Sequence, residues 1–251
     1  MAANLQAKDA SSHVVIIGTW TLPAAKDGKA RKLPDSVMLA DTAIGGGIAE
    51  VVTREEFSGK REQALSLPTF GKFAAGRVVF LGLGDKSSAK EAEIRTFGAR
   101  CARIANGDKA RELTIVVPDG VETRLRALAE GLELGAYRFT KYLTGDRIPK
   151  EALEDVAILT SKKLGVMAKK DLDLGQQVAT GVNVARDLSN EPPNVMTPAQ
   201  LAAESQKIGK AHPGLKVTVF DFKEIRKRGM HLIDAVGRGS TNEPRFIHIA
   251  W

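Results

Sequence analysis

Cysteine and long apolar runs are scarce in this sequence of 251 residues. Its one cysteine, Cys101, allows no intrachain disulfide and no cysteine-based zinc site, and the sequence around it is typical of a helix that buries it as a small apolar residue. A chain with a single cysteine fits a reducing compartment, so we expect a cytoplasmic protein. No apolar run approaches the roughly 18 residues of a transmembrane helix, and residues 14–17 are too few for the core of a signal peptide. The sequence therefore predicts no membrane partner.

Basic residues outnumber acidic ones, with 37 Lys and Arg against 30 Asp and Glu, for a formal net charge of +7. A basic protein is a candidate for nucleic-acid binding. The basic residues lie in short scattered groups, however, and aromatic residues make up only 5% of the chain, so no group interleaves with aromatic side chains. Solvated surface is the simpler interpretation, and DNA binding remains an alternative.

Apolar strand-like segments alternate with helical ones, which predicts an α/β fold with a largely parallel sheet. We expect strands at residues 13–18, 37–40, 63–67, 77–81, 113–117, 156–159, 217–220 and 246–251. We expect helices at residues 48–52, 91–106, 121–139, 172–188 and 198–210, with a short helix after Asp221.

The composition divides the chain into two domains. Residues 1–12 are polar and predict a flexible N-terminus, and residues 13–160 form the first α/β domain. A polar, lysine-rich linker at 161–170 leads to a second domain at 171–251.

Two helix starts carry capping signals. Ser88 and Glu91 have the spacing of a capping box. Thr197 is followed by a proline at the first helical position and by Gln200 at the third, which together favour a helix beginning there.

The residues that usually carry catalysis or bind metals form no convincing constellation. The four histidines make no H-E-x-x-H motif, the carboxylates do not cluster at a predicted strand end, and no G-x-S-x-G elbow occurs. We therefore predict no catalytic and no metal-ligating residue in this chain.

Glycine-rich segments offer one possible ligand site. Gly45, Gly46 and Gly47 precede a predicted helix, so their amides and the helix N-terminus could face an anion such as the phosphate of a nucleotide. Gly82 and Gly84 follow a strand, but Ser87 replaces the third glycine of a dinucleotide-binding loop. A strand-to-loop turn explains Gly82 and Gly84 equally well. Residues 45–47 suit an anion better, but a plain loop is the simpler interpretation there too.

The stretch from Ala185 to Pro198 contains Asn190, Glu191, Pro192, Pro193 and Asn194. It closely resembles the beginning of the catalytic domain in the leucyl aminopeptidase family, the cytosol aminopeptidases of peptidase family M17. Residues 216–221 and 229–246 resemble the segments that follow there, and residues 46–50, 57–60 and 78–84 resemble the family's N-terminal domain. The resemblance implies a macro-domain-like N-terminal α/β domain followed by an incomplete α/β aminopeptidase catalytic domain.

The resemblance also implies a reaction. Family members remove N-terminal residues from peptides with two divalent metal ions, typically manganese, zinc or magnesium, and assemble as homo-hexamers. Their metal ligands lie in motifs of the type G-K-G-x-x-F-D-S-G-G and N-T-D-A-E-G-R, and neither motif occurs here. We therefore expect this chain to bind no active-site metal and to be inactive alone, while residues 190–194 have a structural role.

Two further expectations follow. The macro-like domain could instead be a binding module for a nucleotide such as ADP-ribose, although residues 18–21 lack the acidic residue that macro domains commonly place after the first strand. Residues 246–251 would form an apolar edge of a parallel sheet. We expect residues 1–160 to fold alone and residues 171–251 to be poorly stable.

Overall fold

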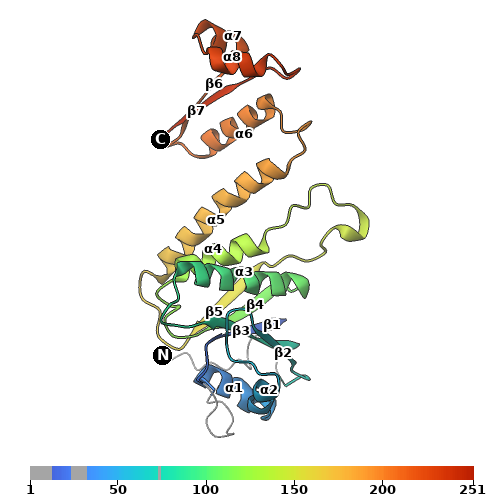
Figure 1. The fold of residues 1–251 in the computed structure, drawn as a ribbon, viewed down its shortest axis with the longest axis vertical. Coiled ribbons are helices and arrows are strands. Elements are labelled where there is room, and N and C mark those ends of the chain that lie inside the picture. Colours follow the sequence, from blue (N-terminus) through green and yellow to red (C-terminus); the bar gives the residue numbers. More distant parts are fainter. Residues whose placement is uncertain (1–12, 24–32, 73–74) are drawn as a thin grey trace. The chain divides into compact units, whose positions relative to one another are not determined.

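The computed structural model describes residues 13–23, 33–72 and 75–251 (Figure 1). The expected flexible N-terminus at residues 1–12 lies outside this part of the chain. Contacts divide the chain into two compact units, with the boundary between Asn183 and Val184. No helix in the described residues is both long enough and apolar enough to cross a membrane.

A five-stranded sheet in the order β2-β3-β1-β4-β5 forms the centre of the first unit. β1 pairs in parallel with β3 and β4, β4 pairs in parallel with β5, and β2 is antiparallel to β3 at one edge. The predicted largely parallel α/β sheet is confirmed. The strands are β1 (Val14–Trp20), β2 (Ala64–Pro68), β3 (Arg77–Gly84), β4 (Glu112–Val117) and β5 (Asp155–Thr160).

Helices cover both faces of this sheet, which explains why β1 is apolar at successive positions. Val15 and Ile17 point into a core with α1 (Asp35–Ile44) and α2 (Ile48–Arg54). Ile16 points into the opposite core with α3 (Glu91–Gly107) and α4 (Leu125–Ala136). Figure 1 shows the two helix pairs on opposite sides of the sheet.

The predicted elements differ from the observed ones at α1 and α4. Residues 37–40, expected as a strand, lie within α1, because Val37 and Ala40 are three residues apart and both bury on one helix face. The helix expected from residue 121 begins only at Leu125, since the amide of Arg124 bonds to the carbonyl of Val121 in a preceding turn.

Capping of α3 also differs from the prediction. The helix begins after Lys90, whose amide donates to Glu93 Oε2 at 2.7 Å, so the acceptor lies two residues later than the expected Glu91. Ser88 instead donates its hydroxyl to the carbonyl of Asp85 at 3.3 Å. The cap at Thr197 is confirmed: its side chain accepts the amide of Gln200 at 3.3 Å.

Glycines bring α3 and α4 into close contact. A Cβ at Gly131 would overlap the carbonyl oxygen of Arg95 and lie 2.8 Å from its carbonyl carbon. The buried carboxylate of Glu130 beside it accepts from Arg95 Nε at 2.7 Å and from Arg126 Nε at 3.0 Å. The pair of helices is therefore joined by backbone packing and by one shared carboxylate.

The second unit is smaller and has few buried side chains. α5 (Ala168–Asn190) crosses the boundary between the units and is followed by α6 (Pro198–Ala211), β6 (Lys216–Phe220), α7 (Phe222–Lys227), α8 (His231–Gly237) and β7 (Phe246–Ala250). β6 and β7 pair in antiparallel register, not as part of a parallel sheet, because α7 and α8 return the chain in the opposite direction. Phe220 stacks on Phe246 across the pair, with ring centroids 5.7 Å apart.

Cys101 lies in α3 and is completely buried, as the sequence predicts. Burial raises the pKa of its thiol well above the usual range, so the reactive thiolate does not form at neutral pH. We expect iodoacetamide to leave the folded protein unmodified at pH 8 and to add one carbamidomethyl group in denaturant. Mass spectrometry checks this, and rapid modification of the folded chain would contradict the burial.

Candidate functional site

The segment that carries the family resemblance forms a tight turn between two helices. α5 ends at Asn190, and the carbonyl of Pro192 accepts the amides of Val195 and Met196, each at 2.9 Å. Pro193 and Asn194 in the middle of the turn are exposed. Two prolines that cannot continue a helix explain why the chain turns here. The structural role of residues 190–194 remains a prediction.

The glycine loop at residues 45–47 joins α1 to α2. Gly45, Gly46 and Gly47 all have positive φ angles, of 91°, 92° and 97°. The amide of Ile48 at the start of α2 donates to Asp41 Oδ1 at 2.6 Å, and the amide of Gly46 donates to the carbonyl of the same aspartate at 2.7 Å. A carboxylate of this chain therefore already lies at this helix end. Anion binding by the loop stays a prediction.

Ligands of open α/β sheets bind outside the carboxyl ends of the strands. Here residues 57–63 lie against the carboxyl ends of β1 and β3, and the two backbones are in direct contact. The amide of Leu22 donates to the carbonyl of Ser58 at 2.8 Å, and the amide of Gly84 donates to that of Gly59 at 3.0 Å. A Cβ at Gly59 would overlap the carbonyl of Trp20. The carboxyl ends of β1 and β3 are thus covered by residues 57–63 of the same chain.

Two side chains that the sequence did not reveal hold this segment in place. Gln63 Oε1 accepts from the amides of Ser58 and Lys60, at 2.7 and 3.2 Å. The guanidinium of Arg100, on α3, donates to the carbonyls of Gly82 and Gln63 at 3.1 and 3.0 Å. Neither residue had a sequence signal. Arg100 acts on carbonyls 18 and 37 positions away, and Gln63 binds the backbone of a loop whose shape the sequence does not give.

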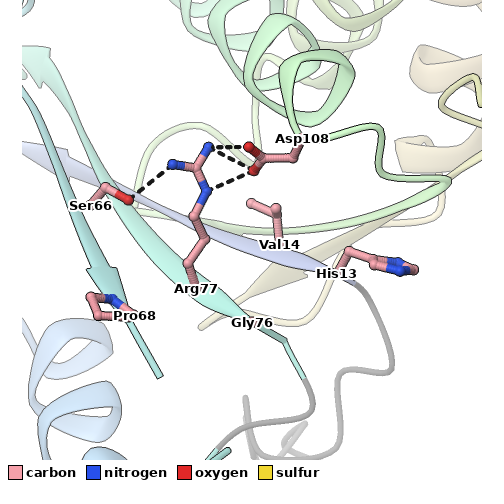
Figure 2. Close-up of a pocket in the computed structure, with 7 residues that line it drawn as sticks. All are labelled: His13, Val14, Ser66, Pro68, Gly76, Arg77 and Asp108. Atoms are coloured by element: carbon pink, nitrogen blue, oxygen red, sulfur yellow. Dashed lines mark hydrogen bonds and ion pairs between the residues drawn. The ribbon is translucent and has the colours of Figure 1, made fainter. Parts of the chain in front are cut away.

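An open pocket of about 430 Å³ lies at the opposite, amino end of the strands (Figure 2). Arg77 spans it, donating to both carboxylate oxygens of Asp108 at 2.7 Å and to the hydroxyl of Ser66 at 3.1 Å. His13 lines the same pocket but points away from Arg77 in Figure 2. The guanidinium of Arg77 is already paired with the carboxylate of Asp108, so the arrangement joins β3 to the end of α3.

The side chains in the described part of the chain do not fit a two-metal centre. Within residues 13–23, 33–72 and 75–251, no three of the His, Cys, Asp and Glu side chains come together as a group that could hold a metal ion.

The fold defines an α/β protein with a mixed five-stranded sheet and a smaller second unit. Residues 16–146 match the N-terminal domain of the cytosol aminopeptidase family, and residues 183–251 match that family's catalytic domain. The chain belongs to the cytosol aminopeptidase family, as its sequence motifs indicate.

Several relatives share this similarity over most of the chain. A probable cytosol aminopeptidase of Roseiflexus castenholzii is 36% identical over 215 residues, covering 83% of this chain and 44% of the relative. A probable cytosol aminopeptidase of Persephonella marina is 31% identical over 227 residues, covering 88% of this chain and 45% of the relative. The chain spans about half the length of the curated relatives it matches.

Solved structures agree with the fold. A tomato leucine aminopeptidase mutant superposes with a TM-score of 0.80 at 25% identity, covering 95% of this chain and 47% of that one. The bottromycin maturation enzyme BotP in complex with Mn superposes with a TM-score of 0.70 at 25% identity, covering 95% of this chain and 45% of that one.

Proposed function

We propose that this chain is part of a metal-dependent aminopeptidase that releases N-terminal residues, leucine among them, from peptides. The observation that carries the proposal is the order of the two family matches, N-terminal domain and then catalytic domain, on one chain. The whole protein would use two divalent ions, manganese, zinc or magnesium, in the cytoplasm, and would assemble as a homo-hexamer. The similarity to BotP, a structure in complex with Mn, supports a divalent metal.

Within that protein, these residues supply scaffold. We assign 13–160 to the macro-domain-like N-terminal domain, 161–170 to the linker, and 171–251 to the first part of the catalytic domain. The turn at residues 190–194 fixes the beginning of the catalytic domain. The metal ligands and catalytic groups lie outside these 251 residues, a proposal supported by the two missing ligand motifs. Nucleotide or DNA binding remains a prediction that no contact described above favours.

The 251-residue chain, with its intact mass verified, is expected to release no leucine from leucinamide in the presence of manganese or zinc. The reason is that a two-metal mechanism needs ligands for both ions, and the chain lacks the motifs that supply them. Chelator-sensitive release of leucine would contradict the assignment of the metal site to other residues.

A chimera provides the positive test. In it, this chain replaces the matching segment of the Roseiflexus castenholzii relative. We expect chelator-sensitive release of leucine from the chimera, because the scaffold is supplied by one protein and the ligands by the other. A chimera that unfolds at the same temperature as the parent relative, yet releases no leucine, would argue against the proposed function.

A further inference from the structure

We propose that Asp119 is a latch that ties the segment following β5 to the carboxyl edge of the sheet. β4 and β5 are paired as far as Val117 and Thr160. Ser161 follows Thr160 directly, and Asp119 lies two residues after Val117. The hydroxyl of Ser161 donates to Asp119 Oδ1. The aspartate thus captures the chain where it leaves the sheet.

A lysine adds a second contact to the same carboxylate. Lys162 Nζ lies 3.3 Å from Asp119 Oδ2 and 3.5 Å from Glu122 Oε1, so one ammonium joins two carboxylates of the loop after β4. The hydroxyl of Thr160 donates to the carbonyl of Lys162 at 2.6 Å, which bends the segment toward this loop. An ion pair at the protein surface contributes little stability alone. Here a hydrogen bond and two ion pairs hold two adjacent residues, Ser161 and Lys162.

The loop that carries the latch is itself fixed. The carbonyl of Asp119 accepts the indole Nε1–H of Trp20, at the end of β1, at 3.0 Å. The latch therefore connects the segment after β5 to the central strand as well as to β4. Beyond it the chain is irregular until α5, where Ala168 is buried in the core shared with α3 and α4.

The latch determines how the lysine-rich segment at 161–167 leaves the sheet and so where α5 begins. Without it, only Leu164 packs as a partly buried apolar residue between Thr160 and the start of α5. This role concerns the first unit alone, and it does not depend on the peptidase assignment.

Limited trypsin digestion of the 251-residue chain tests the latch, because Lys162 and Lys163 place cleavage sites within the segment. In Asp119→Ala, we expect cleavage after these two lysines to accelerate about fivefold, an effect at the upper end for exposed pairs. Cleavage after Lys207, in α6, should not change. Ser161→Ala should give a smaller acceleration at the same two sites.

Glu151→Ala is the matched control, because it removes another exposed carboxylate of the same unit, 3.5 Å from Arg111 Nε. It should leave cleavage after Lys162 and Lys163 at the wild-type rate. The latch is overturned if Asp119→Ala digests at these sites as slowly as the wild type. A rate increase of equal size at every site would also overturn it, since that result indicates general destabilisation.

Discussion

Replacement of Gly131 by leucine is expected to prevent the first compact unit from folding. A Cβ at this position overlaps the backbone of Arg95 on the facing helix, where no rotamer change can relieve the clash. The helices would have to separate, which would also remove Glu130 from Arg95. We expect a loss of more than about 4 kcal/mol, a large part of the stability of an ordinary domain.

Circular dichroism during thermal unfolding measures this effect, and Gly107→Ala is the control. Gly107 ends α3, and a Cβ there would meet no atom within 4 Å. That variant should unfold at or slightly above the wild-type temperature, since alanine favours helix by about 1 kcal/mol over glycine. A cooperative transition within a few degrees of wild type for Gly131→Leu would show that the two helices tolerate separation.

The second compact unit is expected to exchange its amide hydrogens at least about a thousandfold faster than the central strands of the first. Among the described residues, only two of the buried hydrophobic side chains, Ala202 and Ile225, belong to this unit. Leu232 and Val236 are more than four-fifths exposed. Little apolar area therefore opposes the conformational entropy of residues 184–251.

Hydrogen exchange with mass spectrometry on the intact chain compares the two units in one sample, so each serves as the control for the other. Peptides from β1 and β4 should exchange only through global unfolding, and peptides from β6 and β7 within the earliest time points. Equal protection of the two sets would mean that residues 184–251 gain stability from contacts that their burial does not reveal.

The periodicity of apolar residues and the length of apolar runs were sufficient to predict most of the fold from the sequence. β1 and β4 are short apolar runs covered on both faces, and such runs have few alternatives once their length excludes a helix. The same reasoning failed for residues 37–40, because four apolar or small residues fit one face of a helix as well as a strand. The antiparallel pairing of β7 was missed because pairing depends on the path of the connecting helices.

The candidate site was predictable only in part. The family motif at residues 190–194 was visible because it is continuous in sequence. Arg100 and Asp119 were not, since each acts on residues about 20 to 40 positions away, and a charged side chain in a sequence gives no sign of which distant carbonyl or hydroxyl it will meet. Contacts of that kind require the folded chain.

The close approach of residues 57–63 to the sheet bears on which sequences this fold accepts. Gly59 has a φ of 74°, and a side chain there or at Gly82 would displace backbone. Lys60, which follows Gly59, is exposed. In a library of random substitutions, the two glycines should survive selection for folding almost unchanged while position 60 drifts freely. Sequence changes in this region should therefore accumulate at position 60 and be rare at positions 59 and 82.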